Sequence, residues 1–362
     1  MKKLLFWGLL LISTAACGAP ALVYNGDTLE WNTEWKRTKC GDLITKNNIV
    51  EVSGIACSRV TPGFIWMESD ETAGYIIATD EKGSKRACKL KMSKTIGWDW
   101  EDMSGGVYNG TNYLFIGSFG DNDEKRKDYR IIWFEEPAID SVNMPQQTVT
   151  PNYIKYVYPD SASHNNEALM YDNLEQKIYI ITKVYYNVCQ VFSLPFRLDY
   201  GDEVQTLTYE CDLGVKSDLG GGSKPDKGFH LVTAADISPD GHHILIKNQN
   251  NTSSQYSWIL YWHREDGESV VEAIQRQQPQ PLRCYVVEWQ GEAICWLDST
   301  TFYTTSDEDE GNPPIYKYTK RDASGIEELP AENNKADLVY LSGTLYIRNK
   351  DALYTLDGRK VR

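Results

Sequence analysis

Short apolar runs alternate with polar turns along most of the chain, and one motif opens each group of runs. It has a polar or small residue, then a small residue or Asp, then an apolar residue, then in most copies a small one. The copies are spaced by 48, 66, 68 and 57 residues. They begin at Ser53, Glu101, Glu167, Ala235 and Glu292. Recurring units of about 40–50 residues, each made of short strands, predict a β-propeller.

Five units follow from this spacing. The first spans residues 49–92, the second 98–157, and the third begins at His164; the fourth opens with LVTAADISPDG and the fifth with YVVEWQGEAICWLD. The later segment ADLVYLSGTLYIRNKDALYTLDG predicts three more strands. Combined with one strand from residues 17–48, such as 21–24, they would form a sixth blade that closes the ring. We therefore expect an all-β fold, a single propeller over residues 49–362, with six blades favoured and five as the alternative.

The first twenty residues, MKKLLFWGLLLISTAACGAP, resemble an export signal. Two lysines precede an apolar run that is too short to span a membrane. Cys17 follows Ser13-Thr14-Ala15-Ala16, which resembles a relaxed bacterial lipoprotein box. We expect residues 1–16 to be a signal peptide and the protein to be lipid-anchored at Cys17 in the cell envelope, its only membrane contact. Secretion without an anchor is the alternative.

The charge of the chain bears on its partners, and its cysteine content bears on disulfide bonds. The chain has 37 Lys and Arg against 51 Asp and Glu, a formal net charge of −14. Such a surface repels phosphate backbones, so we expect no nucleic-acid partner. Seven cysteines follow Cys17, and export would permit disulfides. Cys189 and Cys211 flank a predicted hairpin, so we expect them to lie opposite each other. Cys284 and Cys295 could lie on neighbouring strands, and buried free thiols are the alternative.

Several segments resemble, in order, one family of exported bacterial β-propeller proteins. They are SGIACS, DWEDM, GSFGDN with a nearby EEP, NEALMYD with ITK, TAADISPDG, and GEAI with TTSDE. The more distant similarity is to six-bladed propellers of the gluconolactonase and phytase-like groups, several of which bind calcium; this is an analogy of fold. The sequence departs from the family pattern at Ser118, where Asp is usual. The C-terminal ALYTLDGRKVR also resembles the start of sorting tails of exported Bacteroidetes proteins, so the last ~25 residues either close the ring or form a shortened tail.

Candidate chemistry centres on the innermost strands. Equivalent positions of these strands form a ring, which places Glu101, Glu167 and Glu292 together, with Asp102 and Asp236 one residue further on. So many carboxylates need a cation or a proton between them. Oxygen ligands favour Ca²⁺ or Mg²⁺, and a carboxyl with a raised pKa beside an ionised one is a general acid/base pair. The alternative is structural: the carboxylates accept backbone N–H bonds and connect the blades.

The remaining candidates lie near this ring. Asp121 begins a polar loop with oxygens on alternate positions, which makes it a candidate metal ligand with Glu101, Asp102, Glu167 and Glu292. Four other residues are candidates for the mouth of the channel. These are Lys183 and His164 as catalytic helpers, and Lys247 and Trp100 as ligand contacts.

Three functions remain open from the sequence. The favoured one is a cell-envelope lipoprotein that binds a glycan or small molecule at one mouth of an acidic channel, with Ca²⁺ as a candidate cofactor. The second is a calcium-dependent hydrolase, lactonase or polysaccharide lyase that uses Glu101, Glu167, Glu292, His164 and Lys183. The third is a protein-interaction scaffold. The sequence does not decide whether the protein is an enzyme.

Overall fold

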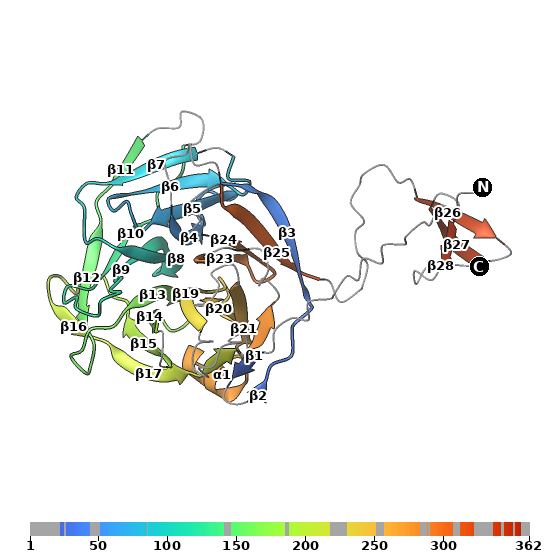
Figure 1. Cartoon of the computed structure of the whole chain (residues 1–362). Coiled ribbons are helices and arrows are strands. Elements are labelled where there is room, and N and C mark those ends of the chain that lie inside the picture. The colour runs from blue at the N-terminus through green and yellow to red at the C-terminus, as the bar shows by residue number, and fades with distance from the viewer. Residues whose placement is uncertain are drawn as a thin grey trace, which may run out of the picture. The chain divides into compact units, whose positions relative to one another are not determined.

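The structure is a computed structural model in which five β-sheets surround a common axis (Figure 1). It describes residues 22–24, 27–43, 51–84, 86–140, 146–184, 188–217, 230–250, 257–282, 288, 290–306, 312–321, 336–341, 344–349 and 352–355. The expected signal peptide, Cys17, Cys284 and the glycine-rich stretch 218–228 lie outside these residues. The described part of the chain confirms an all-β propeller.

The first two blades each add a short strand to four main ones. Blade one consists of β4 (Val52–Cys57), β5 (Phe64–Ser69), β6 (Tyr75–Asp80), β7 (Arg86–Met92) and β11 (Gln146–Val149). Blade two consists of β8 (Trp100–Tyr108), β9 (Thr111–Ser118), β10 (Arg130–Glu135), β12 (Asn152–Val157) and β16 (Val204–Thr206). The added strands β11 and β16 run parallel to β7 and β12, whereas the main strands pair antiparallel.

The other three blades have four strands each. Blade three consists of β13 (Asn166–Asp172), β14 (Lys177–Thr182), β15 (Cys189–Pro195) and β17 (Thr208–Leu213). Blade four consists of β19 (His230–Ile237), β20 (His243–Asn250), β21 (Ser257–His263) and β22 (Gln280–Leu282), with the helix α1 (Val270–Arg276) between the last two. Blade five consists of β23 (Ala293–Asp298), β24 (Thr301–Thr305), β25 (Pro314–Lys320) and β3 (Trp35–Asp42).

The described residues form five blades, the alternative count, and the favoured sixth blade is not formed. A strand from the N-terminal segment does close the ring, but it is β3, and it completes blade five by pairing antiparallel with β25. The three C-terminal strands pair among themselves as β26 (Ala336–Leu341), β27 (Thr344–Asn349) and β28 (Ala352–Thr355). They belong to a separate compact unit, residues 321–362. The segment near 21–24 is β1 (Leu22–Tyr24), which pairs with β2 (Asp27–Thr28) and β18 (Val215–Ser217).

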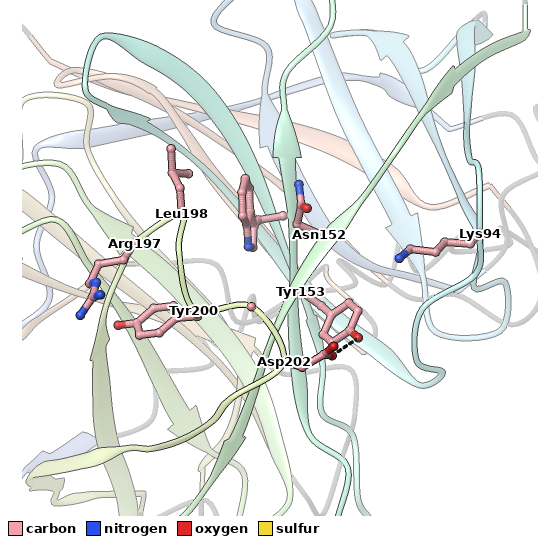
Figure 2. A pocket seen from close by; sticks show the side chains of 9 residues that line it. Lys94, Asn152, Tyr153, Arg197, Leu198, Tyr200 and Asp202 are labelled. Atoms are coloured by element: carbon pink, nitrogen blue, oxygen red, sulfur yellow. Dashed lines mark hydrogen bonds between the residues drawn. The ribbon is translucent and has the colours of Figure 1, made fainter.

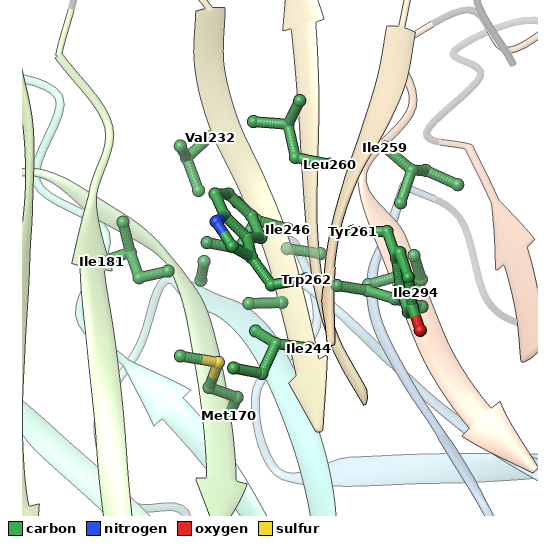
Figure 3. Close-up of a cluster of buried hydrophobic side chains, with 14 of the residues drawn as sticks. Met170, Ile181, Val232, Ile244, Ile246, Ile259, Leu260, Tyr261, Trp262 and Ile294 are labelled. Carbon is green, nitrogen blue, oxygen red and sulfur yellow. The ribbon is translucent and has the colours of Figure 1, made fainter. Parts of the chain in front are cut away.

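Packing between blades explains why the inner strands are buried on both faces. Every residue of β4 and of β13 is buried, because neighbouring sheets cover both sides of these strands. Figure 3 shows one such layer, where Met170 and Ile181 of blade three meet Val232, Ile244 and Trp262 of blade four. Within the described residues, no helix is long and apolar enough to cross a membrane.

Candidate acidic site at one end of the inner strands

Four of the five inner strands carry a β-bulge at the same level, and in three of them the bulged residue is a member of the predicted ring. The pairing with the second strand shifts at Ser53, Glu101, Glu167 and Thr233. In blade five, Glu292 directly precedes β23. Bulges commonly re-aim a side chain beside a functional site.

Local backbone strain marks the same end of three blades. Glu51, Asp99 and Gln290 have φ of 53°, 57° and 42°, and each lies two residues before a ring position. Residues other than glycine rarely adopt this left-handed conformation, and where they do the surrounding structure must stabilise it.

The register of blade four corrects one part of the predicted ring. Its bulged residue is Thr233, so Ala235 is not a ring member. Asp236 therefore lies at the level of Ser104, two residues further along the strand than expected, and it accepts a hydrogen bond from the Ser104 hydroxyl at 3.0 Å. The motif can begin at Thr233 or at Ala235, because the residues of this segment are small. The sequence analysis placed it at Ala235, and the strand pairing places it at Thr233.

The three ring glutamates meet around one lysine. Glu101, Glu167 and Glu292 are only 6%, 3% and 7% exposed, and Lys183, which follows β14, is 8% exposed. The ammonium of Lys183 donates to Glu167 Oε2 in a buried ion pair. Asn165 Nδ2 lies 3.4 Å from the other oxygen of Glu167, and Gln249 Nε2 lies 3.3 Å from Glu292 Oε1. The structure thus brings together the three glutamates and the lysine that the sequence singled out.

Charge within this group is unbalanced. Burial raises the pKa of Glu101 well above its ordinary range, and the negative charge of Glu167 raises it further, although Lys183 opposes this. Burial also raises the pKa of Glu167, against the attraction of Lys183. Burial lowers the pKa of Lys183, but the attraction of Glu167, Glu292 and Glu101 outweighs burial, so its pKa lies above the ordinary value. Lys183 is therefore charged, and the carboxyl of Glu101 holds a proton more readily than an exposed glutamate does.

Three further carboxyls join the group, and the sequence analysis missed them. Glu68 and Asp70 lie at the end of β5, and Asp99 lies just before β8. Glu68 is fully buried, and neither of its carboxyl oxygens accepts a hydrogen bond of good geometry among the described residues, although the nearby Gly54 amide lowers its pKa somewhat. Burial raises the pKa of Glu68, and the charges of Asp70 and Glu292 raise it further. Burial raises the pKa of Asp70 to about 6, with Asp99 and Glu167 among the charges that add to the shift.

A register signal could have located Glu68. It lies opposite Gly54 in the β4–β5 pairing. A side chain at Gly54 would place its Cβ 2.6 Å from Glu68 Oε1. A glycine after the ring position, facing an acidic residue on the next strand, thus indicates a carboxyl that turns toward the ring. We call Glu68, Asp70, Asp99, Glu101, Glu167, Glu292 and Lys183 the acidic cluster.

The two predicted aspartates act on the backbone. Asp102 is fully buried and accepts hydrogen bonds from the amides of Met103 at 2.8 Å, Leu169 at 2.8 Å and Ala235 at 3.2 Å. Asp236 accepts one from the Trp296 amide at 2.8 Å. These bonds connect blades two, three, four and five at the axis. These bonds agree with the structural alternative, in which carboxylates accept backbone N–H bonds and connect the blades. Asp102, and not a glutamate, accepts most of them.

Asp121 and His164 have partners outside the acidic cluster. The Asp121 carboxylate accepts from the amides of Lys125 and Arg126, both at 2.8 Å, and from the Tyr129 hydroxyl at 2.6 Å. His164 Nε2 lies 2.9 Å from Asp160 Oδ2. Asp121 therefore stabilises its own loop, and the structure does not bring the His164 ring to the glutamates.

Lys247 and Trp100 are also interior residues. Lys247 is fully buried and lies two residues before the position equivalent to Lys183, so the two lysines do not share one site. Its ammonium donates to Glu288 Oε2 at 2.6 Å and to the carbonyl of Thr305 at 2.9 Å. Trp100 is fully buried, and its indole donates to the carbonyl of Ile96. Neither can contact a ligand at the surface, whereas the neighbouring Trp98 is 54% exposed.

Metal binding was tested on the geometry of the described residues. No three of their His, Cys, Asp and Glu side chains are arranged to hold a metal ion. Of the five expected metal ligands, Asp102 and Asp121 use their oxygens on protein donors, while Glu101, Glu167 and Glu292 share the acidic cluster. Calcium binding stays a prediction, and of its five expected ligands these three glutamates are the ones that lie in one cluster.

A separate cavity of about 200 Å³ lies between the outer parts of blades two and three (Figure 2). Lys94, Asn152, Tyr153, Arg197 and Tyr200 are among the residues that line it. Its polar groups largely satisfy one another: the carboxylate of Asp202 accepts from the Tyr153 hydroxyl at 2.7 Å and from Lys155 at 3.0 Å. This cavity contains none of the residues of the acidic cluster.

Comparisons with known proteins add little to this picture. No family model matches the chain, and no curated protein matches it. Among solved structures, a gluconolactonase of Xanthomonas campestris is 8% identical with a TM-score of 0.40, and the match covers 83% of this chain and 97% of that one. The periplasmic gluconolactonase of Pseudomonas aeruginosa is 11% identical with a TM-score of 0.35, over 83% of this chain and 81% of that one. The β-propeller domain of Cps50 (Swd1) from Myceliophteria thermophila is 12% identical with a TM-score of 0.35, over 73% and 82%.

Gluconolactonase propellers are thus among the similar structures, as the resemblance implied. At these TM-scores the similarity carries no conclusion about activity. The described residues form a five-bladed propeller with a buried acidic cluster at one end of its inner strands.

Proposed function

We propose that the protein binds a positively charged small molecule at the acidic cluster. The supporting observation is that six carboxyls face two cationic groups, the ammonium of Lys183 and the guanidinium of Arg126, which acts on Asp99. A bound ammonium or guanidinium group would supply the missing positive charge and the hydrogen-bond donors that the Glu68 oxygens lack. Amines, amino sugars and basic amino acids belong to this class. Export and a lipid anchor at Cys17 remain part of the proposal.

Binding of a cation at the acidic cluster should change the protonation of its carboxyls. The pKa of Glu101 and that of Glu68 lie above the ordinary range mainly because of burial. A cationic ligand would lower both pKa values, so binding releases protons that these carboxyls hold in the free protein. A neutral sugar would release none. Proton release therefore distinguishes a cationic ligand from a neutral glycan.

Isothermal titration of the full chain tests this proposal. The ligands are spermidine, arginine and glucosamine, with glucose as the neutral match for glucosamine, and each is titrated in two buffers of different ionisation enthalpy. We expect an amine to bind with a buffer-dependent heat and glucose not to bind. In Glu101→Gln and Glu292→Gln, affinity should fall by about tenfold or more, since a charge-assisted hydrogen bond contributes about 1.5–3 kcal/mol. The control Glu135→Gln changes an exposed carboxyl on β10 and should bind normally.

Two results would count against cation binding. One is the absence of heat with every amine. The other is equal affinity in the Glu101→Gln, Glu292→Gln and Glu135→Gln variants. If Ca²⁺ after chelation raises the thermal midpoint and amines do not, the acidic cluster is instead a metal site.

A hydrolase is the second candidate, and one specific observation favours it. Lys183 forms an ion pair with Glu167 and opposes the rise of its pKa, whereas burial and the charge of Glu167 raise the pKa of Glu101 well above its ordinary range. Two carboxyls in such unlike environments can act as base and acid. Turnover of a lactone or glycoside that is lost in both Glu101→Gln and Glu167→Gln, with the fold intact, would identify an enzyme.

A further inference from the structure

Two cysteines face each other where the ring closes. Cys57 ends β4, the inner strand of blade one, and Cys295 lies in β23, the inner strand of blade five. Their sulfur atoms are 3.4 Å apart, and the two residues are separated by 238 positions in the sequence. Both are reduced in the structure. A covalent S–S bond is about 2.05 Å, so the sulfurs need to approach by roughly 1.3 Å.

A cavity gives access to one of the two thiols. It holds about 500 Å³ between blades one and five, and Cys57, Phe64, Glu81, Tyr303 and Lys317 are among the residues that line it. Cys57 is 6% exposed, whereas Cys295 is 1% exposed and does not line this cavity. An oxidant in the cavity therefore meets Cys57 first.

We infer that Cys57 and Cys295 form a disulfide that covalently joins the first and last blades. The oxidant belongs to the disulfide class, either a thiol–disulfide exchange protein or a small molecule such as oxidised glutathione. The inference does not depend on the proposed ligand, because neither cysteine belongs to the acidic cluster.

The exchange proceeds in two balanced steps. The Cys57 thiolate attacks one sulfur of the oxidant, which forms a mixed disulfide and expels one thiolate. The Cys295 thiolate then attacks the Cys57 sulfur, which forms the Cys57–Cys295 bond and expels the second thiolate. The two cysteine protons end on the two released thiols, so the cysteine pair is oxidised and the oxidant is reduced. Burial raises the pKa of Cys295 well above its usual value, which makes the second step slow at neutral pH and faster in alkali.

The strand register and hydrogen bonds of three other cysteines differ from those of this pair. Cys189 and Cys211 lie on the adjacent strands β15 and β17, but Cys211 pairs with Val191 and Cys189 with Leu213, so the predicted opposition of these two is wrong. The thiol of Cys88 donates to the side chain of Gln147 at 2.8 Å.

The test is oxidation of the purified full chain by glutathione disulfide, followed by alkylation, proteolysis and mass spectrometry. We expect a linked peptide pair that contains Cys57 and Cys295, and faster migration on a non-reducing denaturing gel because the loop between them is long. The oxidised protein should unfold at a midpoint several degrees above the reduced protein, since the link restricts the unfolded chain. This shift should vanish in Cys295→Ser and persist in Cys189→Ser.

Three outcomes would overturn the inference. They are full alkylation of both cysteines after oxidation, a glutathione adduct that stays on Cys57, and a link from Cys57 to another cysteine. Because Ser at a buried site can impair folding, Cys295→Ala is measured beside Cys295→Ser. Peptide mapping of the unmutated chain gives an answer even if both variants fail to fold.

Discussion

Asp102 holds three strands together at the axis, and its replacement should be costly. Its Oδ2 accepts the amides of Leu169 in blade three and Ala235 in blade four, and its Oδ1 accepts the amide of Met103. In Asp102→Ala these three buried amides lose their acceptor. A buried N–H left without a partner costs about 1–3 kcal/mol, and the neighbourhood relaxes in part, so we expect a loss of about 3–5 kcal/mol in the free energy of unfolding.

The cost of burying the Asp102 carboxylate reduces the expected loss in the free energy of unfolding, because Asp102→Ala also removes this buried group. Burial raises the pKa of Asp102, and the three amides only partly offset the shift. Asp102→Asn separates the two effects because it removes the charge and keeps one oxygen. That oxygen can face Leu169 and Ala235, which leaves the amide of Met103 opposite an NH₂ group. We expect Asp102→Asn to lose about 1–2 kcal/mol, less than Asp102→Ala.

Urea unfolding followed by tryptophan fluorescence measures both variants. Asp123→Asn is the control, because the Asp123 side chain is 80% exposed and pairs only with Lys125 among the contacts described here. A loss below about 0.5 kcal/mol in Asp102→Ala would refute the argument, since surface changes fall in that range. A gain in Asp102→Asn would show that desolvation outweighs the hydrogen bonds. Both variants should keep the amine affinity of the folded protein, because no Asp102 oxygen is left for a ligand.

Two further predictions concern buried charges. Lys247→Met leaves the fully buried Glu288 without its ammonium partner, so the free energy of unfolding should fall by about 3–5 kcal/mol, and less in the double variant Lys247→Met/Glu288→Gln; equal losses in the two would contradict this. Burial lowers the pKa of His243 from 6.5 to about 4, so the folded state disfavours the proton that the unfolded state accepts. Stability from this group is complete above pH 6.5 and declines as pH falls toward 4, by roughly 1–2 kcal/mol after solvent screening. His243→Gln should remove this decline when urea unfolding is compared at pH 7 and pH 4.5, and an unchanged pH profile would contradict the assignment.

The repeat motif was sufficient to predict the fold class and part of the acidic cluster. Glu101, Glu167 and Glu292 were predictable because each lies at the start of a buried inner strand or directly before it, and small and apolar residues follow it in a fixed order. The motif failed in blade four, where Thr233 and Ala235 both fit it. Strand pairing distinguishes them, and pairing depends on residues outside the motif.

The blade count and Glu68 required contacts that are distant in sequence. The closing strand β3 has the sequence WKRTKCGD, and its burial pattern shows one buried residue, Trp35. An outer strand that is largely exposed lacks the apolar run that identifies the inner strands, so the sequence favoured residues 21–24 instead. Glu68 was missed because it reaches the acidic cluster from the second strand of blade one, whereas the prediction considered the innermost strands.

The pairing of β3 with β25 also sets an order for the biogenesis of the protein. Asp42 pairs with Pro314, so the partners are 272 residues apart. During synthesis or N-terminus-first transport, β3 emerges before the other strands of the five blades. Its partner β25 emerges only after almost all of the propeller. Contacts this distant form late and slowly. Until then the outer edge of blade five stays open to other chains, and the three Lys and Arg residues among the eight of β3 act against wrong pairing in the interval.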